Sequence, residues 1–234
     1  MEAVGVKSEL GVVPNTENVF QCQECILFGT VYKDHKDELL CRLAGLCDPG
    51  QGKFSEHEMM FTLRVGAGRS ATSAPPVEGV SQDVISVRLR RKFGNANKME
   101  EHQWHVRYVS PPQPDPTTPA IVRRTVHSIV RSPDMMTFLK DLGFRMDFEY
   151  MANGVTFTCG KIKVIVQQLT RTDQIGNYEA AHIKQVSENS WFVEASVSLP
   201  AGVDYKPAVR SLIDFTDQLR PLVNMQRVDY WKKM

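Results

Sequence analysis

Apolar and polar residues alternate along most of this chain, and that period of two is typical of half-buried β-strands. The alternation predicts strands at 24–32, 54–65, 85–90, 104–109, 144–151, 155–159, 162–166 and 191–199, and a closing strand at 222–228. The segment 120–131 fits a helix as well as a strand. Its β-branched residues, and the helix start that follows it directly, favour a strand.

Three other stretches carry apolar residues three and four positions apart, which is the period of an amphipathic helix. They are 36–47, 133–142 and 206–220. The second stretch begins with Ser132 and Pro133, residue types favoured at helix N-termini. It ends at Gly143, which can take the left-handed conformation common after a helix.

A hairpin is expected after this second helix. The strand at 144–151 has one apolar and one charged face. Asn153-Gly154 then readily adopts the positive φ angles of a tight type I′ turn. The sequence therefore predicts a short helix that leads into an antiparallel meander, with the chain reversing at 153–154.

The number of strands determines the fold class that we predict. A sheet of eight or more twisted strands tends to curl, split or close, and closure removes its exposed edges. We expect a mainly β (α+β) fold, a closed antiparallel β-barrel with about three peripheral helices. A β-sandwich is the second choice.

The length of 234 residues suits one large core. We expect a mobile N-terminal tail at 1–20 and a single barrel domain at 21–234, with surface loops near 66–82, 111–119 and 170–190.

A formal net charge of +1 gives no global attraction to nucleic acid or to an anionic membrane. No apolar run approaches the ~20 residues that span a bilayer. Five cysteines, an odd count without dense spacing, favour free thiols in a reducing compartment.

Motifs for metal binding and catalysis are weak. Cys22-x-x-Cys25 with Cys41 and Cys47 lacks the spacing of a zinc site, and the histidines show no metalloprotease pairing. The sequence contains no Gly-x-Ser-x-Gly elbow and no glycine-rich phosphate loop. We therefore assign no catalytic, cofactor-binding or metal-binding residue, and we expect no cofactor.

Two carboxylate pairs suggest one enzymatic alternative. Glu56-x-Glu58 and Asp147-x-Glu149 each place two carboxylates on one face of a strand. Basic residues on other strands are Arg88, Arg90, Arg107, Arg145, Lys161 and Lys163. Inside a closed barrel these groups could hold a divalent metal and a polyphosphate, as in tunnel-type triphosphatases. The simpler interpretation is that the charges form the solvated face of the strands, and the alternation does not say which face is interior.

The basic run at 88–92 could contact phosphates or act as a nuclear import signal. Its leucine and its place in a strand favour a solvated strand end instead. Nucleic-acid readout also needs exposed aromatic residues, whereas the aromatic residues here lie in apolar rows. We expect no direct nucleic-acid binding.

An ordered set of short segments spans about residues 23–230. The segments are Gly45–Asp48, His57–Met59 with Phe61, Trp104-His105 with Arg107-Tyr108, Phe138-Leu139 followed by Gly143–Asp147 and Glu149, Pro200–Gly202 and Gln218–Val223. In this order they resemble the family of subunit eighteen of the Mediator head module. The N-terminal tail, the loop at 66–82 and the segment 170–190 depart from the family.

The resemblance implies a barrel like that of the RNA triphosphatases but without their activity. The expected function is that of a non-enzymatic structural subunit of the Mediator coactivator head module in the nucleus, which links transcription regulators to RNA polymerase II. The resemblance also implies a heterodimer with Mediator subunit twenty and capture of the C-terminal helix of subunit eight, and it leaves a contact with RNA polymerase II open. The alternative is a metal-dependent triphosphate hydrolase of the tunnel type on the same barrel.

Overall fold

The computed structural model describes residues 21–64, 84–93, 103–179 and 181–228. Its strands are β1 (Gln21–Tyr32), β2 (Gly52–Arg64), β3 (Val84–Lys92), β4 (Gln103–Val109), β5 (Ile121–Arg131), β6 (Arg145–Cys159), β7 (Ile162–Thr172), β8 (Ile183–Gln185) and β9 (Ser190–Pro200). Its helices are α1 (Lys36–Leu46), α2 (Met135–Asp141) and α3 (Lys206–Asp217), with a 3-10 turn η1 (Lys33–His35) before α1. None of the helices in these ranges is long and apolar enough to cross a membrane. The tail predicted at 1–20 and the loop predicted at 66–82 lie outside the described residues.

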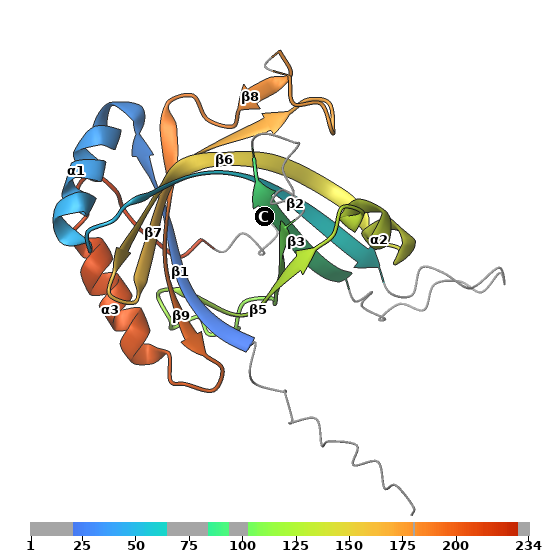
Figure 1. The fold of residues 1–234 in the computed structure, drawn as a ribbon. Coiled ribbons are helices and arrows are strands. Elements are labelled where there is room, and N and C mark those ends of the chain that lie inside the picture. Colours follow the sequence, from blue (N-terminus) through green and yellow to red (C-terminus); the bar gives the residue numbers. More distant parts are fainter. Residues whose placement is uncertain (1–20, 65–83, 94–102, 180, 229–234) are drawn as a thin grey trace, which may run out of the picture.

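Eight of these strands close into an antiparallel barrel (Figure 1). Their hydrogen-bonded order is β6-β2-β3-β4-β5-β1-β9-β7, and β6 pairs with β7 to complete the circle. The ambiguous segment 120–131 is strand β5, and the short β8 adds to the end of β7. The predicted closed barrel with three helices is confirmed, and closure leaves both edges of the sheet hydrogen-bonded.

The larger apolar cluster lies outside the barrel, where α1 and α3 cover β1, β7 and β9 on one flank (Figure 1). The residues of β1, β7 and β9 in this cluster are Cys25, Leu27, Val31, Ile162, Val164, Val166, Val193, Ala195, Val197 and Leu199, and Val122 of β5 and Phe157 of β6 join them. The helices contribute Leu39 and Leu43 from α1, and Val209, Leu212 and Phe215 from α3. The apolar face of the alternating strands therefore points outward on this flank.

A smaller apolar cluster lies beneath α2, across the barrel from α1 and α3 (Figure 1). Met135 and Leu139 of α2 join Met59, Phe61, Leu89 and Trp104 from β2, β3 and β4. The Trp104 indole N–H donates to the Ser132 carbonyl at 2.8 Å, which ties the start of α2 to β4. The predicted helix stop is confirmed, because Gly143 has a φ of +90°.

The hairpin turn predicted at Asn153-Gly154 is wrong. β6 runs through both residues, and the chain reverses at Gly160-Lys161, where Gly160 has a φ of +56°. β6 pairs with β2 on one side and with β7 on the other, so the two ladders hold Asn153-Gly154 extended. Gly154 serves a different purpose here: a Cβ at this position would clash with the Val166 carbonyl oxygen and lie 2.8 Å from the Gln167 Cβ.

The closing strand predicted at 222–228 is also wrong, since only one bridge forms there. Phe28 and Gln226 exchange two backbone hydrogen bonds of 3.0 and 2.8 Å. Val223 and Met225 pack over Gly29, where a Cβ would lie 2.6 Å from the Val223 Cγ1. The apolar alternation in this segment therefore reflects packing across β1 rather than a ladder.

Candidate functional site

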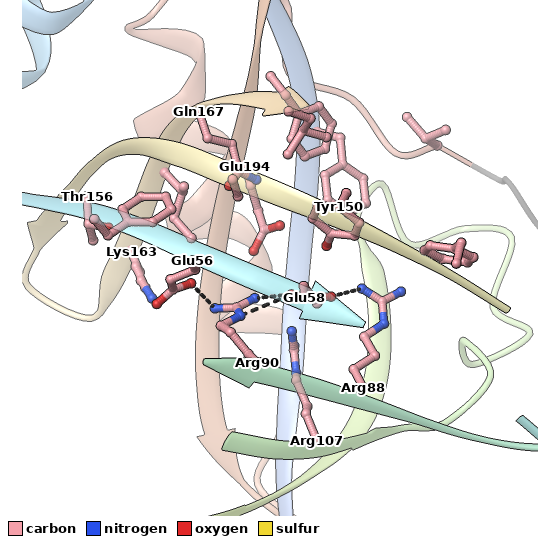
Figure 2. A pocket seen from close by; sticks show the side chains of 18 of the residues that line it. Glu56, Glu58, Arg88, Arg90, Arg107, Tyr150, Thr156, Lys163, Gln167 and Glu194 are labelled. Carbon is pink, nitrogen blue, oxygen red and sulfur yellow. Dashed lines mark hydrogen bonds and ion pairs between the residues drawn. The ribbon is translucent and has the colours of Figure 1, made fainter. Parts of the chain in front are cut away.

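Charged side chains line one part of the barrel interior, and aromatic and aliphatic side chains line the other part. Two adjoining cavities of about 410 and 470 Å³ share a set of lining residues, so we treat them as one lumen. The shared residues are Glu56, Glu58, Arg88, Arg90, Arg107, Lys163, Ile165 and Glu194. Figure 2 labels all of these side chains except Ile165 and shows the labelled ones pointing toward one another from β2, β3, β4, β7 and β9.

The first predicted carboxylate pair lies in this lumen, but arginines occupy it. Glu58 pairs with Arg88 at 3.2 Å and with Arg90 at 2.7 Å, and Glu56 pairs with Arg90 at 3.2 Å. Burial alone would raise the pKa of the Glu58 carboxyl group. The guanidinium groups of Arg90 and Arg88 outweigh burial and lower that pKa, so Glu58 is an ionised partner in a network.

The second predicted pair does not line the lumen. Glu149 is buried on the outer side, where its Oε2 lies 2.8 Å from the His57 Nε2 and accepts from the Tyr178 hydroxyl at 2.7 Å. Asp147 is exposed and accepts from the Thr62 hydroxyl at 3.0 Å. On both β2 and β6 the even-numbered residues line the lumen, Glu56 and Glu58 on β2 and Phe148 and Tyr150 on β6, so the odd-numbered Asp147 and Glu149 are not among the lining residues. The two carboxylate pairs therefore do not meet. They cannot act together on one ligand.

His57 is buried, as expected for a core or rim histidine. The Arg91 Nε–H lies 3.4 Å from the His57 Nδ1, so Nδ1 is the acceptor and Nε2–H donates to Glu149. Burial lowers the pKa of His57, which agrees with a neutral ring in this arrangement. The cluster of His57, Glu149 and Tyr178 holds the β7–β8 connection against the outside of the barrel.

A second ion-pair cluster in the lumen was missed by the sequence reasoning. Glu24 of β1 pairs with Arg107 at 2.6 Å and with Arg123 at 2.8 Å. Burial would raise the pKa of Glu24, but the two guanidinium groups lower it. The sequence offered little local signal for this pair, because β1 also carries Gln21 and Gln23, and β5 also carries Arg124, His127 and Arg131.

Two lumen residues stand apart from these networks. Within the described part of the chain, the side chains of Lys163 and Glu194 make no hydrogen bond or ion pair, although both line the two cavities. Burial, together with the nearby Glu24 charge, raises the pKa of Glu194. Of the other basic residues considered, Lys161 lines the lumen as well, whereas Arg145 does not.

The lumen does not fit a catalytic divalent metal. Among the described residues, no group of three His, Cys, Asp or Glu side chains comes together as a metal site. The oxygens of Glu24 and Glu58 already accept from arginines, so they are not free as ligands. The cysteines considered for zinc are free thiols, and burial raises the pKa of Cys25 and of Cys47 to about 11.

Comparison with known proteins identifies the family. The family model "Med18 protein" matches residues 23–232. The chain belongs to the Med18 family. The Mediator of RNA polymerase II transcription subunit 18 of Caenorhabditis elegans is 45% identical over 92% of this chain and 87% of its own length. The Danio rerio subunit 18 is 31% identical over 93% of this chain and 94% of its own length.

Solved structures support the fold. A chain of the Schizosaccharomyces pombe Mediator head module aligns with a TM-score of 0.67 and 15% identity, over 88% of this chain and 98% of that chain. The PH1819 protein of Pyrococcus horikoshii OT3 aligns with a TM-score of 0.52 and 12% identity, over 89% of this chain and 96% of that chain. Med18 proteins are non-catalytic Mediator subunits, so the family predicted from the sequence is confirmed and the hydrolase alternative is set aside.

Proposed function

We propose that this Med18-family chain works as a structural subunit of the Mediator head module in the nucleus, linking transcription regulators to RNA polymerase II through protein–protein contacts. The observation that carries this proposal is the family match over residues 23–232. The lumen is consistent with it, because its carboxylates hold arginines in place instead of leaving a free set of metal ligands.

The proposed partners are Mediator subunit twenty, in a heterodimer, and the C-terminal helix of subunit eight, with RNA polymerase II as a further contact. Support comes from apolar side chains on the outside of α2 and β3. We define the α2 patch as Met136, Phe138 and Leu142, which are 37%, 55% and 52% exposed, together with Ile85, which is 38% exposed. Exposed apolar patches of this kind mark protein–protein contact sites.

We assign the α2 patch to subunit twenty rather than to the subunit-eight helix. The patch is continuous from helix to sheet, since Gly143 lies against Leu63, the cross-strand partner of Ile85. Its side chains protrude from a helix, whereas a single bound helix needs a groove for its apolar face. A folded partner with a complementary surface suits this convex patch better.

We also propose that residues 21–234 act as a single domain. The support is the pairing of β1, from the start of the described chain, with β9 near its end. The residues after α3 then return to β1 through the Phe28–Gln226 bridge. The first and last described segments are therefore held against each other in one barrel.

Co-expression with subunit twenty tests the proposal. We expect a stable one-to-one complex on a sizing column, with its absolute mass measured by light scattering, and slower dissociation when the subunit-eight helix is added as a peptide. A chain that stays at its own mass of 26.5 kDa in the presence of subunit twenty would refute the heterodimer. Imaging of the tagged chain in cells tests the nuclear location separately.

A further inference from the structure

We infer that the lumen is a binding site for a linear phosphate chain, either free polyphosphate or the triphosphate of a nucleotide, which it holds without hydrolysis. The side chains that carry this inference line the barrel interior, whereas the proposed assembly uses the outer surface. The inference therefore goes beyond the structural role and can fail independently of it.

The lumen carries an excess of positive charge. Among the described lining residues, cationic side chains outnumber carboxyl groups by two. The cations are Arg88, Arg90, Arg107, Arg123, Lys161 and Lys163, and the carboxyl groups are those of Glu24, Glu56, Glu58 and Glu194. A lining that served only to neutralise itself would need no such excess. Positive charges that are confined together by the barrel walls attract a compact polyanion strongly.

The carboxylates hold the guanidinium groups in place instead of consuming all their donors. Glu58 fixes Arg88 and Arg90, and Glu24 fixes Arg107. The buried Nε atoms of Arg88 and Arg107 have no hydrogen-bond partner among the described residues. Guanidinium groups that are already oriented bind phosphate oxygens with little further loss of side-chain freedom.

Lys163 adds a cation that no described residue engages. It is paired with Ser196 across the β7–β9 ladder, and Glu194 lies one inward position away on β9. Burial raises the pKa of Glu194, which favours the protonated carboxyl group, and that form can donate a hydrogen bond to a phosphate oxygen. A neutral Glu194 would also increase the positive excess by one.

Aromatic rings line the other part of the lumen. Phe28 and Phe192 stack with their centroids 5.4 Å apart, and Phe148 and Tyr150 stack at 6.4 Å. The cavity of about 410 Å³ that contains these rings lies within the range of roughly 300–1,000 Å³ found for small-molecule sites. Charged and aromatic parts within one cavity suit a phosphate chain joined to a flat base, so a nucleotide should bind more tightly than inorganic triphosphate.

The test is calorimetric titration of the full chain with sodium tripolyphosphate, in EDTA and at low salt. We expect saturable one-to-one binding, weakened about tenfold or more by Lys163→Met, which removes a charge without breaking an ion pair within the described structure. The matched control is Lys140→Met, because Lys140 is an exposed lysine on α2 outside the lumen. Its titration should match that of the unmodified chain.

Three outcomes would overturn the inference. They are an absence of binding with up to about 1 mM ligand, an equal loss in the Lys163 and Lys140 variants, and release of orthophosphate in ³¹P NMR spectra. Titration with ATP distinguishes the sources: tighter binding than tripolyphosphate identifies a nucleotide, and equal binding identifies free polyphosphate. Lys163→Met should still form the one-to-one complex with subunit twenty, so failure of ligand binding and failure of assembly can be told apart.

Discussion

The two outer flanks of the barrel are built from the same kind of alternating strand but are covered very differently. On one flank, α1 and α3 bury the outward faces of β1, β7 and β9 in an extensive apolar cluster. On the other, the seven-residue α2 covers a small cluster on β2, β3 and β4 and exposes Phe138 and Leu142. The first flank is sealed within this chain, whereas the second leaves apolar surface for a partner.

This difference means that the α1/α3 flank contributes mainly to the stability of the fold, whereas the α2 flank has apolar side chains that could contact a partner. Buried apolar area contributes about 25 cal/mol per Å², so the flank with more buried residues supplies most of the hydrophobic stabilisation. The α2 flank contributes less, and its exposed side chains can bury their area only in a complex. Mutations on the two flanks should therefore affect different measurements.

The largest expected effect is on the sealed flank. Leu212 of α3 is fully buried, and Leu212→Ala should lower the free energy of unfolding by about 2–5 kcal/mol through lost burial and a cavity. Leu139→Ala on α2 should fall at the lower end of that range, because the thin layer can relax around the gap. Urea unfolding measures both changes. If Leu139→Ala lost more free energy of unfolding than Leu212→Ala, the α2 flank would contribute more to stability than the sealed flank, contrary to this comparison.

The next effect is at the seam between the flanks, where β6 pairs with both β2 and β7. Gly154→Ala should destabilise the chain by about 1–3 kcal/mol, because its Cβ would meet the β7 backbone at Val166 and Gln167. Gly45→Ala is the matched control, because Gly45 lies in α1 with no atom within 4 Å of the added Cβ. That change should stabilise the helix by up to about 1 kcal/mol. Equal changes in the thermal unfolding midpoint for Gly154→Ala and Gly45→Ala would contradict close packing of β6 against β7 at Gly154.

The sequence predicted most of the fold, because half-buried strands leave a period of two whichever side is covered. It failed at Asn153-Gly154 and at 222–228, where local signals were outweighed by contacts from distant strands. A turn propensity worth little energy cannot compete with two ladders that hold β6 extended. In the same way, the alternation of Val223 and Met225 reflects packing over Gly29.

The lumen could be predicted only in part. Glu56, Glu58, Arg88, Arg90, Arg107, Lys161 and Lys163 were singled out from the sequence and line it, whereas Asp147, Glu149 and Arg145 do not. Alternation gives the two faces of a strand but not which face is interior, and here the apolar face lies under the helices. The pairing of Glu24 with Arg123 depends on the β1–β5 register, which local pattern does not specify.

A smaller effect should appear with pH on the α2 flank, at the His57 cluster. Because burial lowers the folded-state pKa of His57 below its usual 6.5, the unfolded chain binds the proton more readily. Stability is then retained above about pH 6.5 and is lost as the pH falls from there through the lowered folded-state pKa. Urea denaturation at several pH values across this range should show that the free energy of unfolding depends less on pH in His57→Gln than in the unmodified chain.

The smallest effect on stability should accompany the largest effect on assembly. Phe138→Ser combined with Leu142→Ser alters side chains that are more than half exposed, so the free energy of unfolding should change by no more than about 0.5 kcal/mol for each substitution. The same variant should lose the one-to-one complex with subunit twenty, measured by light scattering. Val203→Ser, at an exposed position near the sealed flank, should retain it. If the double variant still binds, subunit twenty contacts another surface, and the exposed apolar residues of α2 need a different explanation.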